Sequence, residues 1–161
     1  MNLVSAREHP HDEALKRLYP LYLHDLSAFT DYYSLDRGGN WEPDHLPDWL
    51  TLELQHPFLV YEGDVPAGFS LVAEAPFEHM HHGGDYQLFE FFVANPFRRR
   101  GLGAAAALET FRRFPPGEWV VSEVPRNVAA QAFWRRVIGD LTGGVYSEET
   151  LPGDVVQRFR T

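Results

Sequence analysis

Hydrophobic and polar residues follow two different periods along this chain of 161 residues, and the two periods predict its secondary structure. Between Asp12 and Phe29 the apolar residues recur every three or four positions, which predicts an amphipathic helix with Asp12 as its N-cap. Pro20 falls inside this pattern and is expected to kink the helix or to divide it in two. A second, short helix is expected at residues 47–55.

Shorter apolar runs bounded by turn residues predict strands at residues 58–62, 66–73, 85–93 and 119–124, with others near 3–5, at Val145-Tyr146 and at 155–159. In the run 85–93, strict alternation would place Leu88, Glu90 and Phe92 on one face, with Phe89 and Phe91 on the other. Helices are expected at residues 102–114 and 127–138.

This order combines hairpins with strand–helix–strand units. Such a combination predicts an α/β architecture: a mixed, mostly antiparallel central sheet with helices on both faces. The length suits a single domain over residues 1–161, because the chain carries no internal repeat, low-complexity tract or linker.

One segment carries most of the chemical information. The apolar run that ends at Asn95-Pro96 is followed by three arginines, two glycines and a run of alanines. This pattern predicts a strand, a tight basic turn and a helix N-terminus. Unpaired N–H groups and the helix dipole favour an anion there, glycine allows close approach of the main chain, and arginine adds charge-assisted hydrogen bonds. The pattern therefore indicates a pyrophosphate site.

Arg98-x-x-Gly101-x-Gly103 is neither the dinucleotide fingerprint nor a P-loop. It resembles the acyl-CoA pyrophosphate loop of the GNAT superfamily of N-acyltransferases, whose pattern is Gln/Arg-x-x-Gly-x-Gly/Ala. A second segment, Asn127-x-x-Ala130-x-x-Phe133-Trp134, resembles the Asn-x-x-Ala-x-x-Phe-Tyr that opens the next helix of that family. The two motifs lie within residues 87–138, about a third of the chain.

The resemblance implies a GNAT-like fold and transfer of an acetyl group from acetyl-CoA to a primary amine of a small molecule or peptide, by direct attack. Phe92 and Val93 would pair with the pantetheine amides, and the Val93 N–H would polarise the thioester carbonyl. Asn127 and Phe133 would lie beside the cofactor. The pyrophosphate would be held by the loop residues Arg98, Arg99, Arg100, Gly101, Leu102, Gly103 and Ala104.

Glu90 is the first candidate for the general base, because a glutamate in an apolar strand is costly unless it is paired or useful. Glu123 is the second candidate. An edge-exposed or salt-bridged carboxylate remains the alternative for Glu90. The family's usual acid, a tyrosine, is replaced here by Trp134, whose indole N–H is too weak an acid to protonate a thiolate.

Three alternatives therefore stay open for the leaving thiolate: Tyr146 or Tyr86 donates the proton, the proton comes from water, or the protein binds or senses acyl-CoA with little turnover. An unrelated α/β binding protein with an incidental glycine loop is a further alternative. The acceptor could be a polyamine, an aminoglycoside, an amino acid or a protein lysine. The acyl chain length is equally open.

The net charge of −9 argues against nucleic-acid binding and favours a cationic acceptor, although it also serves solubility. With no cysteine the chain has no disulfide, thiol nucleophile or thiolate metal site. The His79–His82 cluster is interpreted as a polar loop, so no metal is expected. No apolar run has the length of a membrane span and the first ten residues do not resemble a secretion signal, so a cytoplasmic protein is expected. The fold is also compatible with a homodimer.

Overall fold

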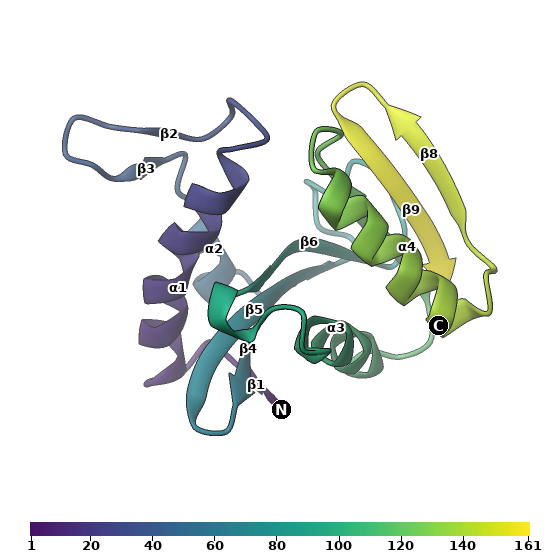
Figure 1. Cartoon of the computed structure of the whole chain (residues 1–161), viewed down its shortest axis with the longest axis horizontal. Helices are drawn as coiled ribbons and strands as arrows, with labels where there is room; N and C mark the ends of the chain where they lie inside the picture. The colour runs from purple at the N-terminus through teal and green to yellow at the C-terminus, as the bar shows by residue number, and fades with distance from the viewer.

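Seven strands form one mixed sheet at the centre of the protein, which a computed structural model describes over all 161 residues (Figure 1). Every neighbouring pair is antiparallel except β6 and β7. Across the sheet the strands are β1 (Asn2–Ser5), β4 (Gln55–Glu62), β5 (Val65–Glu74), β6 (Tyr86–Val93), β7 (Glu118–Glu123), β9 (Asp154–Arg160) and β8 (Ser147–Leu151). The expectation of a mixed, mostly antiparallel sheet is confirmed.

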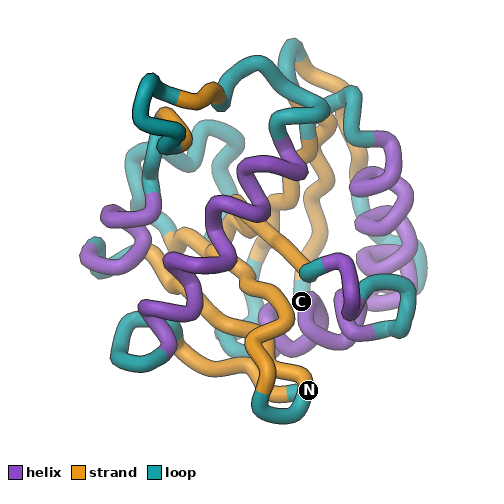
Figure 2. The backbone as a smooth tube through the Cα atoms, turned by 60° about the vertical axis from the view of Figure 1, so that its left-hand side comes forward, coloured by secondary structure: helices purple, strands orange, loops and turns teal.

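Helices cover both faces of this sheet, as expected (Figures 1 and 2). On one face, α1 (His11–Leu26) and α2 (Leu46–Thr51) pack in a core that contains Tyr19 and Phe92. On the other, α3 (Leu102–Arg112) and α4 (Val128–Thr142) pack in a core that contains Trp119 and Trp134. The cores separate because successive side chains of a strand point to opposite faces.

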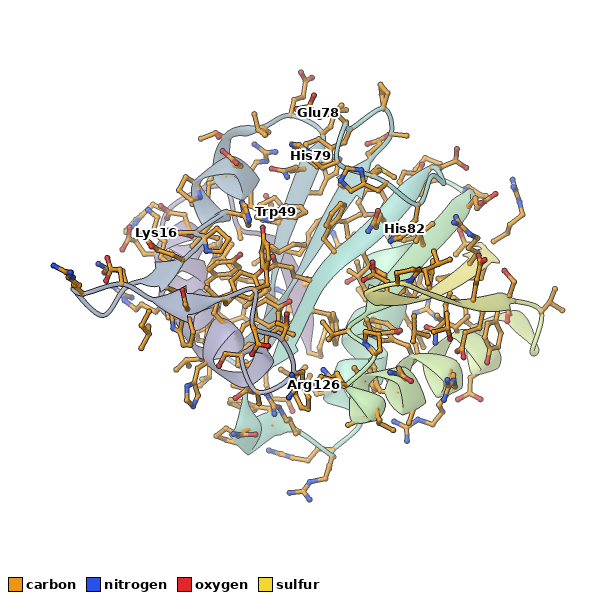
Figure 3. All side chains as sticks on the ribbon, turned by 90° about the horizontal axis from the view of Figure 1, so that it is seen from above. Lys16, Trp49, Glu78, His79, His82 and Arg126 are labelled. Carbon is orange, nitrogen blue, oxygen red and sulfur yellow. The ribbon has the colours of Figure 1, made fainter.

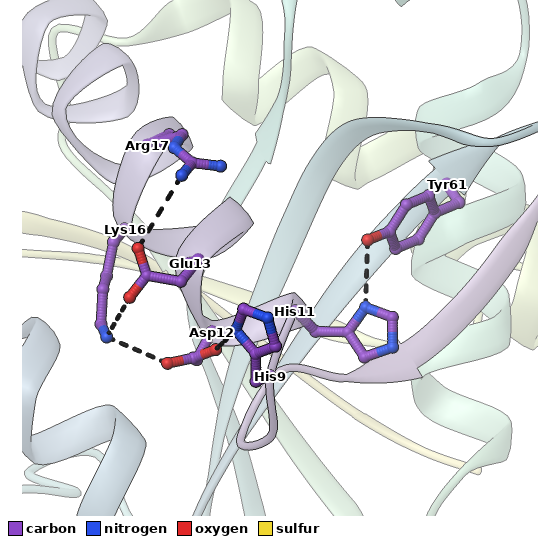
Figure 4. A network of polar contacts seen from close by, with 7 residues as sticks. All are labelled: His9, His11, Asp12, Glu13, Lys16, Arg17 and Tyr61. Atoms are coloured by element: carbon purple, nitrogen blue, oxygen red, sulfur yellow. Dashed lines mark hydrogen bonds and ion pairs between the residues drawn. The ribbon is translucent and has the colours of Figure 1, made fainter.

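The first helix is clarified at its proline and corrected at its N-cap. Pro20 does not divide α1, which runs unbroken from His11 to Leu26 with Tyr19 and Leu23 buried on either side of the proline. Burial of one continuous apolar face outweighs the hydrogen bond that a proline removes. Asp12 is not the N-cap either: it lies inside the first turn and accepts from Lys16 Nζ at 3.0 Å (Figure 4).

A β-bulge corrects the expected alternation of β6. Its register against β5 pairs Leu71 with Glu90 but the next residue, Val72, with Leu88, so Phe89 is the extra residue. Leu88 therefore faces the α3–α4 side, whereas Phe89 joins the core on the α1 side. A bulge inserts one residue and so exchanges the faces of the residues that follow it.

The remaining differences between the expected and the observed secondary structure concern short elements. β8 begins at Ser147, after the expected Val145-Tyr146, and α2 is shorter than expected because β4 already begins at Gln55. A two-stranded hairpin, β2 (Ser34–Leu35) with β3 (Trp41–Glu42), and a 3-10 turn at Asn95–Phe97 were not expected.

Candidate active site

The sheet opens between β6 and β7. Pairing between these two strands ends at Leu88 and Val121, so the later part of β6 has no partner on that edge. Because peptide groups alternate along a strand, those of Phe91 and Val93 face the opening, while Ala94 N–H donates to Ala67 of β5 at 2.8 Å. A free strand edge of this kind can pair with an extended molecule that carries amide groups.

Phe92 does not offer a backbone group on this edge, contrary to the expectation. Its carbonyl oxygen points to β5, where a Cβ built on Gly68 would lie only 2.1 Å from it. The Phe92 side chain packs on the α1 side, in the core with Phe69. Phe91, which sequence reasoning did not select, takes its place on the open edge.

The turn that follows β6 presents a row of free backbone N–H groups. Arg99 and Gly101 both have left-handed backbone, with φ of 58° and 85°, and Gly101 is the N-cap of α3. None of the six N–H groups from Arg99 to Ala104 donates a hydrogen bond within the chain. Such a row at a helix N-terminus attracts phosphate oxygens.

The start of α3 meets the start of α4 beside Val93. A Cβ built on Gly103 would lie 3.3 Å from the Phe133 ring and 3.6 Å from Val93 Cγ2. Phe133 stacks on Phe91 with ring centroids 5.9 Å apart. The structure thus brings both sequence motifs together at the open edge of β6. Asn127 caps α4 by accepting from Ala130 N–H at 3.1 Å.

Arg98 does not extend from the loop as its neighbours do. Its Nε donates to the Val93 carbonyl at 2.5 Å, its guanidinium pairs with Asp25 near the end of α1, and it lies over the Phe92 ring. Arg99 and Arg100 are exposed and form no ion pair. Arg100 lines a hollow of about 340 Å³ with Gly101, Leu102 and Ala105.

Glu90 is the candidate base on the side of the opening that faces α1. It accepts from Tyr19 Oη at 3.1 Å through Oε1, while Oε2 is buried without a partner. Burial raises its pKa to about 8, the Tyr19 hydrogen bond opposes that rise, and Asp44 adds to it. Burial and the nearby Glu90 in turn raise the pKa of Tyr19 and Tyr33. A carboxylate with this pKa is suited to accept a proton near neutral pH.

Glu123, the second candidate, ends β7 on the opposite side of the opening. It is 5% exposed and neither carboxylate oxygen has a hydrogen-bond partner. Burial and the charge of Glu148 raise its pKa to about 8.

A profile of the acetyltransferase (GNAT) family matches residues 20–139, most of the chain and both motifs. The chain belongs to the GNAT acetyltransferase family. This family membership indicates an acyl-CoA-dependent acyltransferase.

Solved acetyltransferase structures superpose on nearly the whole chain at low identity. An acetyltransferase from Thermus thermophilus is 19% identical, with a TM-score of 0.65 and coverage of 100% of this chain and 98% of the other. A GNAT-family protein from Streptococcus agalactiae is 13% identical, with a TM-score of 0.72 and coverage of 99% and 95%. The ribosomal-protein-alanine N-acetyltransferase of Brucella melitensis is 15% identical, with a TM-score of 0.66 and coverage of 100% of both chains. These likenesses establish the fold. A comparison with curated protein sequences finds no significant match.

The GNAT tyrosine position is filled by an indole in the core. Trp134 is 5% exposed and packs on Phe91 and Phe111. The two tyrosines suggested in its place both pack against this core. The Tyr86 ring, at the start of β6, contacts Trp119, and the Tyr146 ring lies near Gly139 of α4.

The histidines of the β5–β6 connection pair separately. His79 Nε2 lies 3.4 Å from Glu78, and both residues are labelled in Figure 3. His82 Nε2 lies 3.4 Å from Asp154. No three histidine, aspartate or glutamate side chains of the chain are grouped as metal ligands. None of the helices combines the length and the hydropathy that a membrane-spanning helix requires.

Proposed function

We propose that this protein transfers an acetyl group from acetyl-CoA to a primary amine of a small molecule or peptide. The observation that carries the proposal is the row of six free N–H groups, Arg99 to Ala104, next to the unpaired edge of β6. The row fits a pyrophosphate, and the unpaired edge at Phe91 fits an amide of a pantetheine arm. Arg99 and Arg100 add positive charge where the phosphates would lie.

In this proposal the Val93 N–H polarises the thioester carbonyl, and Glu90 removes the proton of the incoming ammonium. The raised pKa of Glu90, about 8, follows from its burial beside tyrosines and keeps the group a competent base. Alignment of the amine with the thioester supplies much of the rate, up to about 7–11 kcal/mol in ideal cases.

The proposed acceptor is cationic. A hollow of about 750 Å³ lies against the β2–β3 hairpin, and aromatic and carboxylate groups line it, among them Tyr32, Trp41, Glu42 and Asp44. The charge of Asp44, which lines this hollow, raises the pKa of Glu90 and so links the hollow electrostatically to the proposed base. Aromatic faces with carboxylates stabilise an ammonium by cation–π and ionic contacts. The ribosomal-protein-alanine N-acetyltransferase of the same fold bears a name that implies an amine acceptor.

The acidic composition, the absence of cysteine and the use of acetyl-CoA support a cytoplasmic location for this activity.

The test is calorimetric titration of acetyl-CoA into the wild type, Gly103→Glu and Gly103→Ala. Both variants add a Cβ at the same place, but only glutamate adds a negative charge beside the proposed pyrophosphate site. We expect micromolar binding to the wild type, near-normal binding to Gly103→Ala and at least tenfold weaker binding to Gly103→Glu. A folded wild type without affinity for acetyl-CoA would contradict the proposal.

Turnover is then measured as free thiol released with spermidine, lysine and a lysine-containing peptide. Binding without turnover of any amine would favour an acyl-CoA sensing module, the function that Trp134 at the tyrosine position suggests.

A further inference from the structure

The carboxyl group of Glu123 is buried without a hydrogen-bond donor to satisfy it. The residue is 5% exposed, and both Oε1 and Oε2 lack partners. An ionised carboxylate in such a place is costly, whereas a neutral carboxylic acid carries no charge to solvate and has one O–H to donate. The surroundings of Glu123 therefore favour the acid form.

The neighbouring charges reinforce this preference. Arg135 of α4 is the nearest cation, but it is held by Glu148 of β8, with Nε–Oε2 and Nη2–Oε1 distances of 2.8 and 2.6 Å. Gln157 of β9 donates to the same Glu148 carboxylate at 2.8 Å. Asp154, at the start of β9, adds a further negative charge. Arg135 is thus paired with Glu148 and stabilises the ionised form of Glu123 less than it otherwise would. The negative charge of Glu148 also disfavours ionisation of Glu123.

Glu123 and Glu90 flank the same opening from opposite faces of the sheet. Glu123 is the second residue of β7 beyond Val121, the last residue paired with β6. By strand alternation it shares the face of Val121, which packs with α3 and α4, and the proximity of Arg135 of α4 agrees. Glu90 faces α1 through Tyr19. The loop of free N–H groups begins α3 and so lies on the Glu123 side.

We propose that Glu123 is the proton donor to the thiolate that leaves on acetyl transfer, in the place that Trp134 cannot fill. This inference rests on the proposed acetyltransferase function and assigns the carboxyl groups complementary tasks. Glu90 accepts protons on the acceptor side, and Glu123 gives one on the cofactor side.

The protons and bonds balance. The carbon–nitrogen bond forms and the carbon–sulfur bond breaks, while the acceptor ammonium loses two protons to solvent by way of Glu90. Glu123 passes its proton to the sulfur and regains one from solvent, so each turnover releases one proton. The raised pKa of Glu123 keeps its carboxyl group protonated near neutral pH, so the group holds a proton that it can give to the thiolate.

The experiment compares pH–rate profiles of wild type, Glu123→Gln and Glu148→Gln, with acetyl-CoA and the best amine of the panel. Glu149→Gln is the matched control, because Glu149 neighbours Glu148 on β8 but is exposed and forms no ion pair. Glu123→Gln keeps shape but has no acidic proton, so kcat falls at least tenfold, the alkaline limb disappears and acetyl-CoA affinity stays within about twofold. Glu148→Gln frees Arg135 to stabilise the Glu123 carboxylate, so the alkaline limb moves to lower pH. Glu149→Gln leaves the profile unchanged.

If the wild type is active and Glu123→Gln keeps the wild-type kcat and the alkaline limb, the role of Glu123 is overturned but the proposed function is not. Should Glu123→Gln fail to fold, an unmoved alkaline limb in folded Glu148→Gln overturns it equally. A wild type that binds acetyl-CoA but acetylates no amine overturns the proposed function, and the assignment of Glu123 with it.

Discussion

The Nε of Arg98 donates a hydrogen bond of 2.5 Å to the carbonyl oxygen of Val93, five residues earlier. The same guanidinium pairs with Asp25, so one side chain ties the end of α1 to the open edge of β6. The Val93 carbonyl has no strand partner on that edge, and the arginine satisfies it. Arg98 therefore holds the peptide groups of the opening in place, although its position in the motif suggested a phosphate ligand.

Asp25→Asn distinguishes these two roles of Arg98. If Arg98 positions Val93, loss of the Asp25 charge loosens the arginine and weakens acetyl-CoA binding, by about two- to fivefold. If Arg98 instead binds phosphate, the freed guanidinium strengthens binding. Calorimetry of Asp25→Asn, Arg98→Gln and Arg100→Gln at two salt concentrations measures the difference. We expect the effect of Arg100→Gln to shrink at high salt because that residue is exposed.

Glu90→Gln is expected to lower kcat by about 10²- to 10⁴-fold, because the variant cannot accept the ammonium proton. The acetyl-CoA dissociation constant should stay near that of the wild type, since Glu90 faces α1 and not the loop. In the wild type the ionisation of Glu90 should produce the acidic limb of the pH–rate profile, and loss of the Glu123 proton the alkaline limb. Steady-state kinetics from pH 6 to 10 test this, with the surface variant Glu109→Gln as control. An acidic limb that persists in Glu90→Gln would assign it to another group.

Tyr19→Phe removes the hydrogen bond to Glu90 Oε1 while keeping the ring in the core. That bond stabilises the carboxylate, so its loss raises the pKa of Glu90 and moves the acidic limb of the pH–rate profile to higher pH, by about one unit. Tyr22→Phe is the matched control, because Tyr22 packs against the same core without a hydrogen bond to Glu90. Equal profiles for the two variants would show that the Tyr19 hydroxyl does not act on Glu90.

The raised pKa values of Glu90 and Glu123 make folding stability depend on pH. Their pKa is raised from the ordinary 4.5 to about 8 in the folded protein. Between these values the unfolded chain has released protons that the folded protein still holds, so the free energy of unfolding falls as the pH rises. Glu123→Gln removes one of these groups and should flatten the fall between pH 5 and 8 by about 1–3 kcal/mol. Thermal melts across this range check the slope, and Glu149→Gln should retain the wild-type slope.

Gly68→Ala should destabilise the fold by about 3 kcal/mol or more, because the new Cβ would lie 2.1 Å from the Phe92 carbonyl oxygen and push β6 away from β5. Gly139→Ala is the control: its Cβ would have no neighbour closer than 3.9 Å, and alanine favours a helix, so stability should rise slightly. Denaturant unfolding of both variants gives the two values. A tolerated Gly68→Ala would mean that β6 can shift at this point.

Local sequence patterns were sufficient to predict much of the secondary structure of this protein and the loop of its candidate site. The periodicities in the sequence predicted α1, α3, α4 and the main strands, and the spacing of Arg98, Gly101 and Gly103 after an apolar run predicted a loop with free N–H groups at a helix start. These features depend on neighbours within a few residues, because a helix face, a turn and an N-terminus are all local.

Only the tertiary structure decided which groups meet. The bulge at Phe89 changes which side chains of β6 face each side of the sheet. Pairing between β6 and β7 stops at Val121 and leaves the later part of β6 unpaired on that edge. Arg98 binds Val93 and Asp25 and does not extend from the loop. Glu90 and Glu123 are separated by a helix in the sequence, yet they flank one opening from opposite faces. Their raised pKa values follow from burial, which depends on residues far along the chain. Register, burial and long-range pairing arise only when the whole sheet is assembled, so no local pattern could reveal them.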